Sequence, residues 1–578
     1  MLSTEPTAPM LAVGGRVWCR SGDRDTRSPR RADASRKASK ARARKRAESP
    51  VRRAATVVTS DVAETRADAS TDDAFSLGCP HFDTCSGCST STNLDDFPEL
   101  RRAREYFARS HDAAFDCATG DVRGWRTRAR LAARMVPDED AAGGEKLALG
   151  LFARGSHDLV EIPGCVVQHP RLNDAAALIA SACARAGIRA YDETTGEGEL
   201  RYVQLTAVGA DGRADLDPDA AVQVALVWNS RAPTTAAGPM TAPRAIALAL
   251  KLWNSNSADG PGDIEPPNGV RVHSVWINWN DAPGNKITGP HWTHLKGERF
   301  VWARHGAADV CFTPGSFAQA NSRAFDAALE RIRSFVFRGA AVSELYAGAG
   351  PIGLSIAATM GEDGDDEGSV RCVEIVGAAA ETFERSKSKL PEGVGRRVSM
   401  AISRAEDACR DAVRDADVVI VDPPRMGLDP RTLTALTGGE APAAEAGGAA
   451  PAMAMADGQP EAAVVTEKKP MTRTAKRRAR KKKRAKAANA PVADAKAPEE
   501  PKPSQPTVKF PAPPSRLSRL IYLSCGFAAF QRDCDALVKS GEWRLTHAEG
   551  FNFFPGSDHV ETLAVFDREE TGAAFWEG

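Results

Sequence analysis

The sequence predicts an α/β protein whose second half forms a doubly wound parallel sheet, preceded by an α+β domain. Two observations carry this prediction. Apolar, strand-like runs alternate with helix-like segments from about residue 340 onward, and the first run is followed by the glycine-rich turn "GAGPIG" at 348–353. A sheet of this class binds its ligands at the carboxyl ends of its strands, so polar residues at those ends form the candidate site.

Composition divides the 578 residues into folded and unfolded parts. Residues 1–72 are rich in Arg, Ser, Ala and Asp, and residues 432–513 in Ala, Pro, Glu and Lys. Such segments bury too little apolar surface to offset the entropy lost on ordering. We therefore expect a disordered basic arm at 1–72, a first domain at 73–310 and a second domain at 311–578, with a disordered basic insertion at 432–513.

The formal net charge of zero hides basic clusters in the arm and in "KRRARKKKRAK", residues 476–486. This run is either an address signal or a tethered polycation that attracts nucleic acid, and both remain open. Twelve cysteines without a secretory signal favour reduced thiols. No apolar run approaches the roughly 18 residues that a membrane span needs.

The N-terminus is rich in Arg, Ser and Ala, and in this respect it is similar to a transit peptide. We therefore expect an organelle protein, of a plastid or a mitochondrion. Cytoplasm or nucleus is the alternative location. We also expect a monomer.

Three cysteines lie close together in "CPHFDTCSGCS": Cys79, Cys85 and Cys88, with the spacing C-x5-C-x2-C. Thiolates in such a cluster favour zinc or an iron–sulfur cluster. A fourth ligand is needed, and Cys165 in "EIPGCVV" is the best candidate in the sequence. His81 is nearer, but we expect it to be a solvent-facing residue of the loop.

The segment "GWRTRARLAARM" alternates, so Arg126, Arg128 and Arg130 would share one face of a strand. That face is either a stripe that contacts phosphates or the hydrated side of a sheet.

Polar residues end three of the later strand-like runs. Glu374 closes the second run, where an acidic residue often holds ribose hydroxyls. Asp422 is followed by two prolines that keep the backbone extended, which presents its carboxylate toward the same cleft. Cys525 comes directly before Gly526 in "LIYLSCGF" and is either a small core residue or a protruding nucleophile.

Seven motifs occur in the order in which they stand in the RNA uracil-5-methyltransferases, which the chain resembles over roughly residues 75 to 568. These enzymes use S-adenosylmethionine (SAM) to make 5-methyluridine in rRNA or tRNA. The motifs are "CPHFDTCSGC", "GLFARGSHDLVEIPGC", "FTPGSFAQAN", "ELYAGAGPIGL", "VDPPRMGLD", "YLSCGFAAFQRDCDAL" and "HVETLAVF".

The resemblance implies a SAM-dependent methyltransferase (Rossmann-like) fold for the second domain and an iron–sulfur and RNA-binding role for the first. It also implies residue roles. The [4Fe–4S] ligands would be Cys79, Cys85, Cys88 and Cys165; the SAM-contacting residues Gln319, Tyr346, Glu374 and Asp422; the nucleophile Cys525; and the general base Glu561.

The implied reaction joins Cys525 to uracil C6, which makes C5 nucleophilic. Arg425 could stabilise the thiolate or contact RNA, and Phe317, Phe553 and Phe554 are either stacking partners for the base or core residues.

Two of the departures from the family bear on function. The family's usual Ser-Cys-Asn-Pro loop reads Ser-Cys-Gly-Phe here, which raises the question of how the uracil or the thiolate is oriented. The N-terminal barrel with which many members grip RNA is missing. Two alternatives follow: a catalytically silent iron–sulfur RNA-binding protein, and an RNA cytosine-5-methyltransferase.

Overall fold

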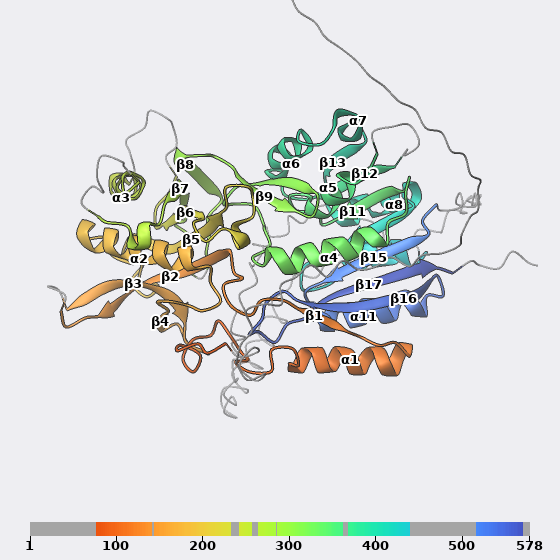
Figure 1. Cartoon of the computed structure of the whole chain (residues 1–578), viewed down its shortest axis with the longest axis horizontal. Coiled ribbons are helices and arrows are strands. Elements are labelled where there is room, and N and C mark those ends of the chain that lie inside the picture. The colour runs from red at the N-terminus through yellow and green to blue at the C-terminus, as the bar shows by residue number, and fades with distance from the viewer. Residues whose placement is uncertain are drawn as a thin grey trace, which may run out of the picture. The chain divides into compact units, whose positions relative to one another are not determined.

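The structure, a computed structural model, describes residues 77–140, 144–232, 242–256, 264–284, 286–361, 368–439 and 516–569. Two large sheets and one hairpin organise these residues (Figure 1). The arm predicted at 1–72 and the basic run at 476–486 lie outside the described residues. Within the described residues, no helix combines the length and apolar character that crossing a membrane requires.

The first sheet has seven strands in the order β4-β3-β2-β5-β6-β7-β8. All neighbours are antiparallel except β6 and β7, whose connection runs through helix α3. One core unites the sheet with α2 and α3. The bounds are β2 (Arg128–Pro137), β3 (Glu145–Phe152), β4 (Leu159–Glu161), α2 (Pro170–Ala186), β5 (Leu200–Val208), η1 (Ala214–Leu216), β6 (Ala221–Trp228), α3 (Pro243–Asn254), η2 (Pro267–Gly269), β7 (Val272–Trp279) and β8 (His291–Gly297).

A two-stranded antiparallel hairpin follows, and it leads toward the second sheet. Its strands are β9 (Val301–His305) and β10 (Ala308–Phe312).

The second sheet has eight strands in the order β1-β16-β17-β15-β14-β11-β12-β13. Strands β11 to β15 are mutually parallel, and β17 is antiparallel to both β15 and β16. The strand bounds are β1 (Cys117–Thr119), β11 (Ala341–Leu345), β12 (Ser369–Glu374), β13 (Val398–Ile402), β14 (Val418–Val421), β15 (Arg519–Ser524), β16 (Trp543–Asn552) and β17 (Glu561–Arg568).

Helices cover both faces of this sheet because its strands are apolar on both sides. In β14, Val419 and Val421 belong to a core with α1, α8, α9 and α11, while Val418 and Ile420 belong to a core with α4, α5 and α6. This confirms the predicted doubly wound α/β fold. The helix bounds are α1 (Pro98–His111), α4 (Ser322–Ser334), α5 (Pro351–Ala357), α6 (Ala379–Lys387), α7 (Glu392–Gly395), α8 (Ala405–Asp415), α9 (Pro430–Leu436) and α11 (Phe527–Lys539).

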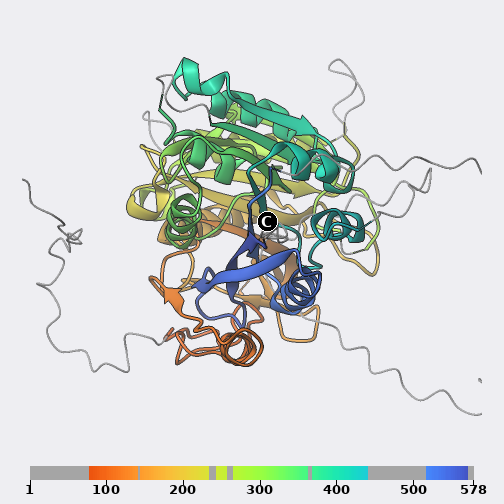
Figure 2. The ribbon, with the colours of Figure 1, turned by 90° about the vertical axis from the view of Figure 1, so that its right-hand side faces the viewer.

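The second sheet also takes up chain that precedes the first sheet in sequence. Strand β1 pairs in parallel with β16, and Leu100, Phe107 and Phe115 pack in the core that holds α11. In both views of the ribbon the orange N-terminal segment lies against the blue C-terminal strands (Figures 1 and 2). The domain bounds predicted from composition, 73–310 and 311–578, therefore cut across this contact.

The start of the predicted insertion needs a correction. Residues 432–436, which we placed in the disordered segment 432–513, form the end of α9. Thr432 and Leu436 are buried, and the Trp543 Nε1–H donates a 2.7 Å hydrogen bond to the carbonyl of Leu436. Composition missed this turn because only a few apolar residues are needed to anchor it. Residues 440–513 lie outside the described residues.

Candidate active site and cysteine cluster

Three of the predicted site residues meet at the carboxyl edge of the eight-stranded sheet. Asp422 follows β14, Cys525 follows β15, and Glu561 opens β17. Because β17 runs antiparallel to β15 and Ser524 pairs with Thr562, the next residue on one strand faces the preceding residue on the other. The register thus places Cys525 beside Glu561.

The charges at this edge act on one another. Burial raises the pKa of the Cys525 thiol, and the carboxylates of Glu561 and Asp422 raise it further, whereas Arg425 lowers it. Burial also raises the pKa of Glu561, as does the nearby Asp422, and Arg425 again opposes the shift. Burial raises the pKa of Asp422 to about 7. Arg425 is therefore the cation that favours the ionised thiol.

Gly526, where the chain departs from the family's loop, has a packing reason to be glycine. A Cβ atom at this position would lie 2.6 Å from the carbonyl oxygen of Arg425 and 3.2 Å from its Cα. The loop after Asp422 therefore rests directly on the backbone that follows Cys525. Any side chain at position 526 would push the two loops apart.

Asp533 on α11 anchors the loop that follows Asp422. It is fully buried, and its Oδ2 accepts hydrogen bonds from the Leu428 amide at 2.8 Å and from the Tyr522 hydroxyl at 2.9 Å. The neighbouring Arg532 donates to Asp533 Oδ1 and to the carbonyl of Met426. This pair lies within the motif "FQRDCDAL", but the motif did not predict its contacts with the loop.

The glycine-rich turn and Glu374 form the predicted nucleotide-binding corner. Glu374 is buried, and its carboxylate accepts hydrogen bonds from the amides of Gly348 and Val376, both at 2.8 Å. A Cβ at Gly350 would lie 2.7 Å from the Phe383 ring, so the turn can pack closely only with glycine there. The backbone conformation thus fixes where a ligand could approach.

Exposed apolar side chains border this corner, which sequence analysis also missed. Ile375 and Val376 directly follow β12, and Ile402 ends β13, with exposed fractions of 54%, 46% and 45%. Apolar groups at the carboxyl edge beside an acidic residue suit a nucleoside, whose base is apolar on its faces and whose ribose carries hydroxyls.

Tyr346 lies between β11 and the glycine-rich turn, with a left-handed backbone conformation (φ +63°). Its hydroxyl donates a 2.7 Å hydrogen bond to Asp429 Oδ2. The other carboxylate oxygen of Asp429 caps α9 by accepting from the amides of Arg431 and Thr432. The tyrosine ring is thereby tied to the loop that carries Asp422 and Arg425.

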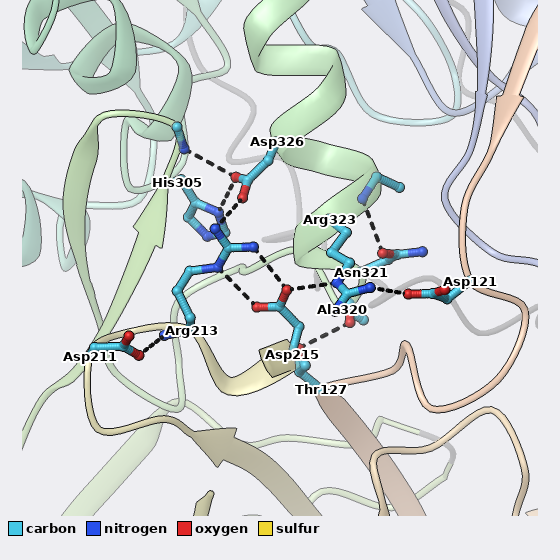
Figure 3. Close-up of polar contacts among 12 residues, drawn as sticks. Asp121, Thr127, Asp211, Arg213, Asp215, His305, Ala320, Asn321, Arg323 and Asp326 are labelled. Atoms are coloured by element: carbon cyan, nitrogen blue, oxygen red, sulfur yellow. Dashed lines mark hydrogen bonds and ion pairs between the residues drawn. The ribbon is translucent and has the colours of Figure 1, made fainter. Parts of the chain in front are cut away.

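Gln319 lies in the connection between β10 and α4, and it lines a small cavity of about 40 Å³ together with Thr127 and Arg128. Several hydrogen bonds from the first sheet hold this connection. Thr127 donates through its amide (2.8 Å) and its hydroxyl (3.0 Å) to the carbonyl of Ala320, and Asn321 caps α4 (Figure 3).

Ion pairs flank the connection on the other side (Figure 3). Arg213 lies between Asp215 and Asp326, at 2.9 and 3.5 Å, and Arg323 contacts Asp215 and Asp121. The connection that carries Gln319 is thus braced by the first sheet and by α4. Its contact with a cofactor stays a prediction.

The arginine stripe has a structural use that neither interpretation of the sequence included. Arg128 is buried and donates to the carbonyls of Pro314 and Ser316, both at 2.7 Å. Arg130 donates to the Gln204 side chain, which in turn donates to Pro314. Alternation identified the shared face, but it could not identify the loop that covers that face.

All four predicted metal ligands line one cavity: Cys79, Cys85, Cys88 and Cys165. His81 is partly exposed, and its Nε2 hydrogen-bonds the carbonyl of Pro163 at 2.9 Å, which joins the two cysteine segments. Among the described residues, no group of three or more His, Cys, Asp or Glu side chains has the arrangement of ligands to a metal ion.

The cysteine segment is fixed by an arginine that sequence analysis did not single out. Arg154 donates to the carbonyls of Phe82, Cys85 and Cys88, at 3.0, 3.2 and 2.7 Å. Burial, with further contributions from the neighbouring thiols, raises the pKa of the Cys88 thiol to about 12. Burial also raises the pKa values of Cys85 and Cys165, and thiols whose ionisation is disfavoured in this way are donors that a cation would stabilise.

The fold and the site define the class of the protein. A doubly wound sheet with a glycine-rich turn after its first parallel strand, and with acidic residues at the ends of the next strands, is the fold of SAM-dependent methyltransferases.

Comparison with known proteins agrees with this class, although no protein-family model matches the chain. An uncharacterized RNA methyltransferase of Protochlamydia amoebophila is 28% identical over 492 residues, which cover 85% of this chain and 98% of that protein. One of Listeria innocua is 24% identical over 367 residues, which cover 61% of this chain and 70% of that protein. The chain is a homologue of these RNA methyltransferases. This confirms, at the level of RNA methyltransferase, the resemblance that its motifs predict.

Among solved structures, the Pyrococcus abyssi tRNA (uracil-54, C5)-methyltransferase in complex with S-adenosyl-L-homocysteine aligns with 18% identity and a TM-score of 0.49. The alignment covers 82% of this chain and 84% of that one.

Proposed function

We propose that this protein is a SAM-dependent RNA (uracil-5-)-methyltransferase that makes 5-methyluridine in rRNA or tRNA. The observation that carries the proposal is the register of β15 and β17. It sets the Cys525 thiol beside the Glu561 carboxylate, with Asp422 and Arg425 close enough to shift their pKa values. A thiol and a carboxylate at one edge are the two groups that this chemistry needs.

The predicted nucleotide-binding corner, formed by the glycine-rich turn and Glu374, suits a nucleoside that carries a sulfonium group. Glu374 would hold the ribose hydroxyls, Ile375 and Ile402 would cover the base, and Tyr346 would line the turn. Asp422 would offer a carboxylate to the positive charge. SAM supplies an electrophilic methyl group on a positively charged sulfonium. Gln319 is a further residue that we assign to SAM.

The protein's own residues would carry the remaining chemistry. The Cys525 thiolate bonds to uracil C6, the electron pair of the C5–C6 double bond moves to make C5 nucleophilic, and C5 accepts the methyl group. Glu561 then removes the C5 proton, and the electron pair of that bond re-forms the double bond as the sulfur leaves C6. Arg425 favours the thiolate, because it lowers the pKa of Cys525.

The uracil must leave its stack to reach the thiol, which costs a few kcal/mol and is least costly in an RNA loop. Phe553 is buried in the core, so it does not serve as a stacking surface in this conformation. Phe317 and Phe554 are partly buried. We keep these two as the candidate stacking partners.

We assign the cysteine site to a [4Fe–4S] cluster held by Cys79, Cys85, Cys88 and Cys165. What supports the assignment is that the four thiols line one cavity and that cysteine thiolates are the usual ligands of such clusters. Iron and sulfide content after anaerobic purification tests this assignment, and stoichiometric zinc without iron would contradict it.

Methyl transfer from labelled SAM to total RNA tests the enzymatic proposal. Wild-type protein should label RNA, Cys525→Ala should not, and Glu561→Gln should accumulate a covalent protein–RNA adduct because the adduct cannot lose its proton. Nucleoside analysis of the product separates 5-methyluridine from 5-methylcytidine. RNA binding without labelling by the wild type would favour the catalytically silent alternative, and full labelling by Cys525→Ala would exclude the thiol mechanism.

We further propose an organelle location for this activity, on the composition of the N-terminus alone. Mapping 5-methyluridine in organelle and cytosolic RNA after deletion of the protein tests this, and loss from cytosolic RNA only would contradict it.

A further inference from the structure

The connection between β16 and β17, residues 553–560, leads directly into Glu561. This connection is held on one side by the segment that contains three of the four cysteines. The amides of Ser89 and Thr90 donate hydrogen bonds to the carbonyl of Gly556, at 2.7 and 3.0 Å. Gly556 therefore joins the connection to the cysteine segment by hydrogen bonds.

Gly556 makes this contact close. A Cβ at position 556 would lie 2.8 Å from Leu77 Cδ1 and 3.3 Å from Cys88 Sγ, and the residue has a left-handed backbone conformation (φ +95°). The peptide of the connection thus packs directly against a sulfur of the proposed metal site. Cys88 is itself fixed by Arg154, which donates to its carbonyl at 2.7 Å.

An apolar cluster extends the contact to the next residues. Phe554 packs edge-on against Trp125, with ring centroids 5.9 Å apart. Both belong to a small core with Leu77 and Val167, against which Cys88 also packs. This core contains few residues, so its stability depends on the contacts that hold the cysteine segment in place.

Both ends of the connection have anchors that are independent of the cysteines, and at the near end Asn321 Nδ2 donates a hydrogen bond to the carbonyl of Phe553 at 3.1 Å. Glu99 at the start of α1 accepts a hydrogen bond from the amide of Val560 at 3.1 Å, and its own amide donates to Asp558 at 2.6 Å. The middle of the connection, at Gly556, depends on the cysteine segment.

We propose that the four-cysteine site positions Glu561: with a metal centre bound through Cys88, the cysteine segment fixes the 553–560 connection at Gly556, and loss of the centre releases it. The role given to Glu561 rests on the proposed function. The metal site then acts on the proton-removal step through the 553–560 connection.

Hydrogen–deuterium exchange tests this without any activity measurement. In anaerobically purified protein, removal of the metal by a chelator should speed exchange in peptides that cover 553–560. Peptides that cover β15, residues 519–524, should keep their exchange rate. Unchanged exchange at 553–560 after complete metal removal would overturn the proposal, whether or not the protein methylates RNA.

A glycine substitution provides the matched variant. Gly556→Ala should release metal to a chelator about 10-fold faster, since groups that support metal ligands typically change affinity by that order. Gly541→Ala is the control, because Gly541 also has positive φ (+74°) but has nothing within 4 Å of the new methyl group. Equal metal release from the two variants would overturn the proposal.

Adduct formation separates positioning from general damage. With RNA and SAM, Gly556→Ala should accumulate the covalent adduct as Glu561→Gln does, because Cys525 stays in place while the base is displaced. The KM for SAM should stay unchanged while kcat falls. A variant that forms neither product nor adduct, with the exchange at 519–524 also raised, would contradict a specific effect on Glu561.

Discussion

The hydroxyl of Tyr346 donates a 2.7 Å hydrogen bond to Asp429, across the gap between the loop after β11 and the start of α9. Tyr346 has a positive φ, which costs a non-glycine residue about 1 kcal/mol or more unless contacts hold it. The bond therefore links the conformation of the cofactor turn to the loop beside Cys525.

Removing that hydroxyl should weaken cofactor binding. Tyr346→Phe keeps the ring and loses one hydrogen bond, so we expect about 0.5–1.5 kcal/mol lower stability and a higher Kd for S-adenosylhomocysteine. Calorimetric titration and urea unfolding measure the two effects. Tyr191→Phe, in the first sheet's core, is the control for the loss of a hydroxyl far from the cofactor turn, and an equal change in Kd for the two variants would contradict the prediction.

Restoring the family's asparagine at position 526 should damage this protein. Gly526→Asn brings a Cβ to 2.6 Å from the carbonyl oxygen of Arg425, and overpacking of this kind costs about 1–3 kcal/mol. We expect lower stability and slower methyl transfer. Gly120→Asn is the control, because a Cβ atom there would meet nothing within 4 Å. An active and equally stable Gly526→Asn variant would show that the loop after Asp422 moves freely.

The stability of the protein should fall as the pH rises from about 4 to about 7. Burial raises the pKa of Asp422 to about 7, so in this range the folded protein keeps a proton that the unfolded chain releases. Asp422→Asn removes the free-energy cost of ionising a buried carboxylate. The variant should therefore be more stable than wild type at pH 8 but not at pH 4. The shift of about three units sets an upper limit of about 4 kcal/mol, and partial exposure reduces it.

Urea unfolding between pH 4 and 8 measures this difference, with the exposed Asp95→Asn as the control. The same ionisation should affect the cofactor. SAM is a cation and S-adenosylhomocysteine is not, so the affinity for SAM should rise relative to that for S-adenosylhomocysteine as the pH passes about 7. A constant ratio of the two affinities would place Asp422 away from the sulfonium.

Asp533 should control the position of the loop that carries Arg425. Asp533→Asn replaces a buried carboxylate with a neutral carboxamide. That carboxylate accepts hydrogen bonds from Leu428, Tyr522 and Arg532. Breaking a buried charged contact of this kind costs about 3–5 kcal/mol. We expect a lower kcat and a higher apparent pKa of Cys525, because Arg425 lowers that pKa. Thiol alkylation rates against pH measure it.

The control for Asp533→Asn is Asp535→Asn, two residues along the same helix. Asp535 accepts from the Tyr106 hydroxyl on α1, away from Arg425. If both variants alkylate alike, the effect of Asp533 would be general destabilisation rather than positioning.

Much of the candidate site could be predicted because strand ends are visible in the sequence. Asp422 and Cys525 each follow an apolar run, and parallel strands bring such ends together. Glu561 was different: it opens a strand, and only the antiparallel direction of β17 brings a strand's start to the same edge. Spacing alone gives no strand direction, so this role depended on the family resemblance.

The contacts that position the site were not predictable, because they join residues far apart in sequence. Arg128 was assigned to a face, but its partners, the carbonyls of Pro314 and Ser316, carry no side-chain signal. The same holds for Ser89 and Gly556, which meet through backbone atoms. A pattern of side chains predicts which residues are apolar or polar, not which main-chain groups they will meet.

The bond between the Glu99 amide and Asp558 spans 459 residues of chain, and β1 pairs with β16 across 433 residues, from Cys117 to Gly550. On the ribosome the first helix of the second sheet would therefore emerge early and remain without its partner until the last strands appear. Its apolar face, with Leu100 and Phe107, would be exposed to solvent during that interval. We expect newly made chains that stop before β16 to be held by chaperones or degraded.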